Sequence, residues 1–138
     1  IDVMRRERRS FGAPPSLLVQ PTLAQFMEQG HFAQHIRRMR RLYAGRRAAL
    51  LQALSEHDGK LFTVDAPPSG LTIMLRLPDD ADDVALTERL KARGIEVQSL
   101  SSHFSGRQKQ QGLLLSFAGF ADKDLVRAAE KLVQLMKG

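Results

Sequence analysis

Apolar residues recur at helical spacing between residues 32 and 57. Steps of three, four or seven residues separate Phe32, Ile36, Met39, Tyr43, Leu50 and Leu54. That spacing places them on one side of an α-helix. Arginines fill much of the remaining circumference, at positions 37, 38, 40, 41, 46 and 47. The pattern predicts a long helix over residues 31–57, with one buried apolar side and one strongly basic side.

A shorter apolar pattern precedes this helix. Leu23, Phe26 and Met27 favour a helix of about three turns. Gly30 is expected to end it, because glycine readily adopts the left-handed conformation that follows many helices. The residues Gly12–Pro15 separate this short helix from the basic segment Ile1–Arg9, since proline cannot continue a helix interior.

After the long helix the apolar period changes to two. Leu71–Leu77 alternates, with Ile73 and Leu75 on one face and Met74 and Arg76 on the other, which predicts a strand with one strongly apolar face. Further strands are predicted over 61–64, 95–98 and 113–117, helices over 82–94 and 122–136, and a polar loop over 99–111.

The predicted order is helix, long helix, strand, strand, helix, strand, strand, helix. Strands and helices intermixed in this way indicate an α+β fold. We expect a small, mostly antiparallel sheet covered by helices, with the long helix as an N-terminal connecting element.

The chain carries 21 basic and 15 acidic residues, a formal net charge of +6. Such an excess suits nucleic acid, anionic lipid or an acidic partner, but also a solvated surface or a subunit interface. The chain has no cysteine, which excludes disulfides and thiol chemistry. No apolar run approaches the roughly 18 residues of a membrane span. We expect a cytoplasmic protein without membrane contact.

Candidate catalytic and metal-binding residues do not form a complete set. His31 and His35 have the spacing of a metal-binding pair on one helix face, but no third ligand is near. Ser101–His103 lacks the turn that exposes a serine nucleophile. Gly106–Gly112 matches neither a P-loop nor a dinucleotide fingerprint. We therefore predict no catalytic residue and no metal site within this sequence.

Several sequence blocks resemble the C-terminal part of MocR-type transcriptional regulators, which join a GntR-like winged helix-turn-helix to a domain of the fold-type I aminotransferase family. The most specific block is 35–43, with His35, Arg37, Arg38, Arg40, Arg41 and Tyr43 as its signature residues. Blocks 24–32, 46–50, 69–71, 94–97 and 112–118 are similar to the family in the same order.

The resemblance implies an aminotransferase-like small domain over residues 31–138, including the long helix 31–57. Residues 1–30 would then be a basic segment and a short helix belonging to a large domain that lies upstream. The family binds pyridoxal 5′-phosphate through a lysine in that large domain, so the Schiff-base lysine is expected before Ile1 and no residue here is expected to hold the cofactor. The expected effector-cleft residues are Gly70, Ser101, Ser102, His103, Phe104 and Arg107.

The resemblance also implies a function. The full protein would bind pyridoxal phosphate, an amino-acid effector or both, and would pass a conformational signal to an upstream DNA-binding domain. Its expected partners are the large domain, a second copy in a homodimer, the effector, and DNA through the separate domain. Two alternatives stay open: the small domain of a genuine class I/II aminotransferase, and a stand-alone basic binding module.

One position separates the regulator from the enzyme. Many aminotransferases carry an arginine in the final strand that binds the substrate carboxylate, and the matching residue here is Leu114. Either Arg107 or Arg76 substitutes for it, or the carboxylate is not bound in this way. The change favours a sensory role.

Overall fold

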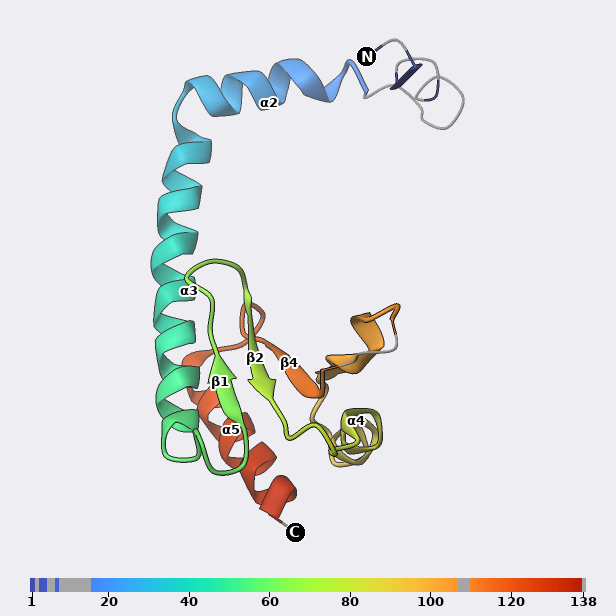
Figure 1. Cartoon of the computed structure of the whole chain (residues 1–138). Coiled ribbons are helices and arrows are strands. Elements are labelled where there is room, and N and C mark those ends of the chain that lie inside the picture. Colours follow the sequence, from blue (N-terminus) through green and yellow to red (C-terminus); the bar gives the residue numbers. More distant parts are fainter. Residues whose placement is uncertain (2, 5–6, 8–15, 107–109, 138) are drawn as a thin grey trace. The chain divides into compact units, whose positions relative to one another are not determined.

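The computed structural model describes residues 1, 3–4, 7, 16–106 and 110–137, and its contacts divide the chain into two units, Ile1–Arg40 and Arg41–Gly138. In chain order the elements are α2 (Val19–Glu28), α3 (His31–Ser55), β1 (Thr63–Asp65), β2 (Thr72–Arg76), α4 (Asp83–Ala92), β3 (Gln98–Ser99), the 3-10 helix η1 (Ser101–His103), β4 (Gly112–Ser116) and α5 (Asp122–Lys137) (Figure 1). The order confirms the predicted α+β class. The division between the units falls inside α3.

The four strands form one sheet in the order β1-β2-β4-β3, and every pairing between them is antiparallel. The predicted sheet is confirmed, but β3 starts at Gln98 rather than at Ile95. The backbone N–H of Ile95 instead donates to Leu90 O and completes the end of α4, after which its side chain enters the core. Ile95 is therefore apolar because its side chain packs in the core, and the strand pairing begins only at Gln98.

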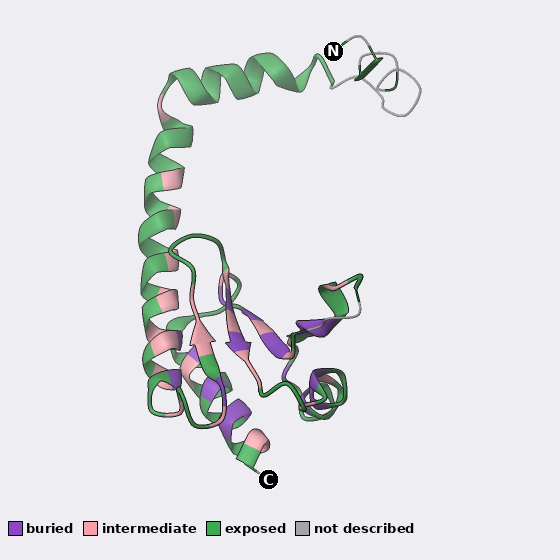
Figure 2. Cartoon of the chain, in the orientation of Figure 1, coloured by how far each residue is buried: buried purple, intermediate pink, exposed green. Residues whose placement is uncertain are grey.

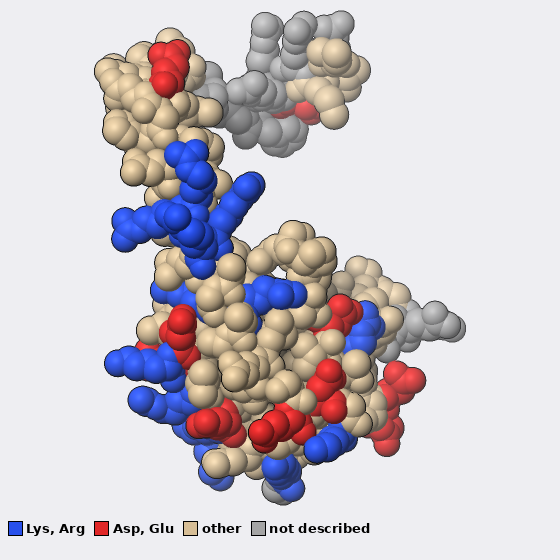
Figure 3. Space-filling view, turned by 90° about the vertical axis from the view of Figure 1, so that its left-hand side faces the viewer, with Lys and Arg blue, Asp and Glu red and all other residues tan. Residues whose placement is uncertain are grey.

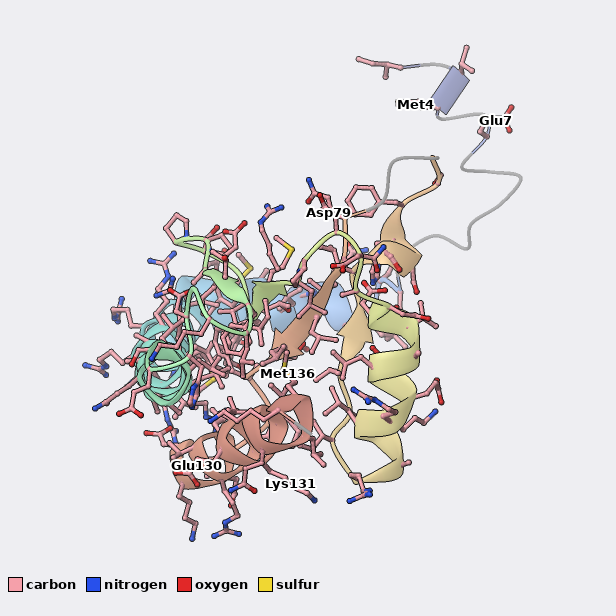
Figure 4. The ribbon with its side chains drawn as sticks, turned by 60° about the horizontal axis from the view of Figure 1, so that its bottom comes forward. Met4, Glu7, Asp79, Glu130, Lys131 and Met136 are labelled. Atoms are coloured by element: carbon pink, nitrogen blue, oxygen red, sulfur yellow. The ribbon has the colours of Figure 1, made fainter. Side chains whose placement is uncertain are left out.

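The hydrophobic core lies on one face of the sheet, against α5 and the second half of α3. Figure 4 shows α5 running along one side of the strands, and Figure 2 shows buried residues gathered between them. The most deeply buried residues of the core are Leu54, Ile73, Leu75, Leu90, Leu113, Phe117 and Leu132. Every second residue of β2 and β4 thus points into the core, and the residues between them point away from it.

The predicted apolar side of the long helix is only half correct. Leu50 and Leu54 are the buried residues of α3, and Tyr43 packs against the core in part. Phe32 is 42% exposed, and Ile36 is only half-buried. The first ten residues of α3 belong to the other unit, whose helix α2 has no buried residue. The predicted buried side is therefore found only in the second half of α3.

Two of the arginines assigned to the basic side have structural partners instead. The Arg46 guanidinium donates to Ala118 O, and its Cζ atom lies 6.0 Å from the centroid of the Tyr43 ring. Arg47 Nη2 donates to Ala66 O at 2.7 Å and to Pro67 O at 3.1 Å. These contacts tie α3 to the loops that follow β4 and β1.

The arginines at positions 37, 38, 40 and 41 are exposed, as predicted. Figure 3, which looks onto α3, shows basic side chains gathered on its exposed part. Within the described residues no helix is long and apolar enough to cross a membrane.

There is no room for a side chain at Gly112, so a substitution there should destabilise the fold. A Cβ atom there would lie 2.6 Å from the backbone oxygen of Leu75, in the neighbouring strand. Gly112→Ala should lower the free energy of unfolding by about 1–3 kcal/mol, the usual cost of overpacking, as measured by urea denaturation. The matched control is Gly119→Ala, whose Cβ would meet nothing within 4 Å. Equal stability of the two variants would contradict the tight approach.

Candidate functional site

The candidate site is the face of the sheet that points away from the core. Strand register places Asp65, Met74, Leu114 and Gln98 in one row across β1, β2, β4 and β3. All four are half-buried or exposed. Leu114, which the resemblance places at the arginine position of the enzymes, lies in the middle of this row beside Met74. The centre of the face is therefore apolar, and its charge comes from neighbouring positions.

Arg76 supplies the positive charge on this face. It pairs with Gly112, two pairs along the ladder from Met74–Leu114, so its side chain emerges on the same face as that of Met74. Arg76 Nη2 and Nε lie 2.8 and 3.2 Å from Asp65 Oδ2, and Nη1 donates to Gln110 Oε1 at 2.6 Å. An ion pair this exposed adds little to stability. Its main effect is to orient the guanidinium along the sheet.

Of the two arginines considered as substitutes at the Leu114 position, Arg76 thus lies on the correct face. Arg107 lies outside the described residues. The Asp65 partner was not foreseen from the sequence, because β1 and β2 had no predicted register.

The six predicted cleft residues do not all gather at one place. Gly70 lies just before Thr72, which pairs with Ser116, whereas the loop with Ser102 and His103 ends at Gly112, which pairs with Arg76. These pairs mark opposite ends of the β2–β4 ladder. The structure therefore brings the loop, but not Gly70, to the end of the sheet that carries Arg76.

Within the loop the predicted residues differ in accessibility. Ser102 and His103 are exposed and Phe104 is half-buried. The Ser102 hydroxyl forms a hydrogen bond with that of Ser99. Ser101 is only 4% exposed, and its hydroxyl points into the protein. Of the predicted loop residues that the structure describes, Ser102, His103 and Phe104 are those whose side chains a ligand can reach.

The partner of Ser101 is Asp83, which lies at the start of the helix predicted over 82–94. Asp83 is fully buried and is the first residue of α4, while Asp82 caps the helix through its bond from Ala85 N. Asp83 Oδ1 accepts from Ser101 Oγ at 2.6 Å, and Oδ2 accepts from the N–H groups of Ser101 at 2.8 Å and Gly112 at 3.0 Å. When the Gln111 amide is oriented so that its nitrogen faces the acceptors Ala81 O and Asp83 Oδ1, it donates to each of them at 3.0 Å.

These bonds decide the ionisation of Asp83. Burial by itself raises the pKa of this carboxyl group, but the hydrogen bonds from Ser101, Gly112 and Leu100 outweigh it and hold the pKa below the ordinary 3.8. The group is therefore ionised at neutral pH and stabilises the fold as a carboxylate.

The described side chains do not fit a covalent attachment site for pyridoxal phosphate. The described lysines are all exposed, at positions 60, 91, 123, 131 and 137. Lys60 Nζ and Lys131 Nζ donate to backbone carbonyls away from the sheet face. Nor do the described residues contain a group of three metal-ligating side chains. The chemistry that Arg76 does fit is a carboxylate or phosphate oxygen.

A hollow lies on the other side of the sheet. It has a volume of about 350 Å³ beside α5, and its lining includes Ile95, Val97, Leu115 and Phe120. The lining is mostly apolar and lacks an arginine. The open face, with its oriented guanidinium beside an accessible loop, is the stronger site.

Comparison with known proteins identifies the relatives of this chain. No family model matches it. The probable rhizopine catabolism regulatory protein MocR of Rhizobium meliloti is 34% identical over 124 residues, which are 90% of this chain and 25% of that protein. This chain is homologous to the MocR-type regulators. Further relatives are HTH-type transcriptional regulators of Bacillus subtilis and Escherichia coli, which confirms the resemblance inferred from the signature helix.

Aminotransferases are also similar to the chain. Aromatic-amino-acid aminotransferase 1 of Thermococcus litoralis is 25% identical over 115 residues, 82% of this chain and 27% of that protein. The structure of LysN, the α-aminoadipate aminotransferase of Thermus thermophilus, superposes with a TM-score of 0.82 at 21% identity, over 97% of this chain and 34% of that one. It was solved with N-(5′-phosphopyridoxyl)-L-leucine. The chain thus has the aminotransferase small-domain fold, and it spans about a quarter of the length of the curated relatives it matches.

The low pKa of Asp83 generates a prediction of pH dependence. A carboxyl group with a lowered folded-state pKa contributes stability that is present above its unfolded pKa and is lost as the pH falls through the folded value. The stability difference between the native chain and Asp83→Asn should therefore be largest above about pH 5 and shrink below pH 3.8. Denaturant unfolding across this range checks it, and a difference that grew on acidification would contradict the assignment.

Proposed function

We propose that this chain is the small-domain part of a cytoplasmic transcriptional regulator whose aminotransferase-like domain binds pyridoxal phosphate, an amino-acid effector, or both. The observation that carries the proposal is the similarity to MocR. An open sheet face with Leu114 at its centre, where the resemblance expects an arginine in the enzymes, supports it. The cofactor would be attached to a large domain, because the described lysines of this chain do not fit that role.

The chemistry of the open face suits a small ligand with an apolar part and an anionic part. Met74 and Leu114 would contact the apolar part, and Arg76 would bind a carboxylate or phosphate oxygen. Asp65 already neutralises Arg76, so an anion has to compete with it. We therefore expect reversible binding that weakens as the salt concentration rises.

The signal would travel through the long helix. Arg46 and Arg47 attach α3 to the loops that follow β4 and β1, so the second half of the helix should follow any displacement of the sheet. A ligand that prefers one position of the small domain would shift the population toward it. The partners of this movement would be the large domain, a second copy in a homodimer, and DNA through a separate domain.

A genuine aminotransferase is the second candidate function. The fold and the similarity to the Thermococcus litoralis enzyme favour it, whereas Leu114 at the centre of the face favours the regulator. A stand-alone basic module that binds nucleic acid is a third candidate, and only the exposed arginines of α3 favour it. Transamination of an amino acid by the complete protein would favour the enzyme, and strongly salt-dependent binding of arbitrary duplex DNA by this chain alone would favour the basic module.

The experiment for the regulator uses the complete polypeptide that the proposal implies. Pyridoxal phosphate and individual amino acids are titrated by calorimetry, and operator DNA binding is measured with and without them. Arg76→Gln should weaken binding of the anionic ligand about tenfold, since a charge-assisted hydrogen bond contributes roughly 1.5 kcal/mol or more.

The matched control is Arg41→Gln, an exposed arginine that lies on α3 and not on the sheet face. Equal losses in both variants would indicate a general effect of charge. An unchanged affinity in Arg76→Gln would remove Arg76 from the site.

A further inference from the structure

The loop between β3 and β4 leaves the sheet and returns to it at neighbouring points. Ser99 pairs with Leu113, and the backbone N–H of Leu100 donates to Gly112 O at 2.8 Å. Ser101 then starts the excursion, and Gly112 ends it. The exposed residues Ser102 and His103 follow directly after Ser101.

A single buried carboxylate binds both ends of this loop. Asp83 accepts two hydrogen bonds from Ser101, through the backbone N–H and the hydroxyl, and one from the N–H of Gly112. Ser101 and Gly112 are 18 and 29 residues away from Asp83 in the sequence. Neither end of the loop can move far from the other without breaking a charge-assisted hydrogen bond to a buried carboxylate.

We propose that Asp83 is the positioning residue of the ligand-contacting loop: it fixes the base of the loop to the N-terminus of α4, so that the two move as one body. The inference rests on the proposed function only in taking Ser102–Phe104 as ligand contacts. The attachment itself depends on the geometry of the carboxylate.

The position of Asp83 is set by α4 and not by the loop. Leu86 and Leu90 anchor α4 in the hydrophobic core, and Asp82 caps its first turn from the solvent side. The carboxylate therefore emerges from a fixed backbone. A ligand that displaces Ser102 or His103 would have to pull α4 along with the loop or break the bonds to Asp83.

The two neighbouring aspartates provide a matched pair of variants. Asp83→Asn keeps the shape and one acceptor but removes the negative charge, and Asp82→Ala removes the helix cap without touching the loop. Amide hydrogen exchange is followed by NMR in the full 138-residue chain. Asp83→Asn should accelerate exchange at Ser101 and Gly112 about tenfold beyond its effect on the core strands. Asp82→Ala should accelerate exchange in the first turn of α4 and leave the loop base unchanged.

The result that overturns the proposal is equal protection of the loop base in the two aspartate variants, or a uniform change across the whole chain. Ser101→Ala gives a second, milder measurement, because it removes only the hydroxyl bond to Asp83 Oδ1. It should accelerate exchange at Ser102 and His103 by a smaller factor than Asp83→Asn does.

Titration of the complete protein with individual amino acids, in the presence of pyridoxal phosphate, separates this inference from the proposed function. If an amino acid binds, Asp83→Asn should lower its affinity several-fold while Asp82→Ala leaves it unchanged, and equal affinities in the two variants count against a positioning role. If the native protein binds neither pyridoxal phosphate nor amino acids, the proposed function fails, and hydrogen exchange still decides whether Asp83 fixes the loop.

Discussion

The constraint on which this structure depends is that one face of a small sheet has to be removed from water. Ile73, Leu75 and Leu113 provide that face, and α5 and the second half of α3 cover it. Burial of each such side chain contributes about 1.5–3 kcal/mol. Because side chains alternate along a strand, this choice also decides that Met74 and Leu114 point the other way. The candidate site thus lies on the face of the sheet opposite the hydrophobic core.

The sequence was informative where structure depends on local period. The alternation of 71–77 and the apolar spacing of the last helix led to β2 and α5 with small errors at their ends, and Gly30 and Gly94 follow helices with positive φ angles as expected. The first half of α3 is helical as predicted, but its apolar side was wrongly expected to be buried, for a physical reason. Helical spacing shows that a helix has an apolar side, but it does not show which part of a protein covers that side.

Long-range polar contacts were not accessible from the sequence. Asp83 belongs to the acidic stretch 79–83, whose composition is typical of a solvated surface. The N–H groups that donate to its buried carboxylate come from residues 18 and 29 positions away in the sequence. Arg46 and Arg47 continue an arginine-rich pattern, yet they bind loop carbonyls while Arg40 and Arg41 remain exposed. In each case residue type and spacing are the same for the buried and the solvated group. Only the tertiary fold separates them.

The acceptors of Arg46 and Arg47 are main-chain oxygens, at Ala118, Ala66 and Pro67. Every amino acid has a carbonyl group in that position, so a different residue at 66, 67 or 118 would present the same oxygen to the guanidinium. The attachment of the helix is therefore encoded almost entirely on the helix side, which leaves both loops free to vary in sequence without releasing it.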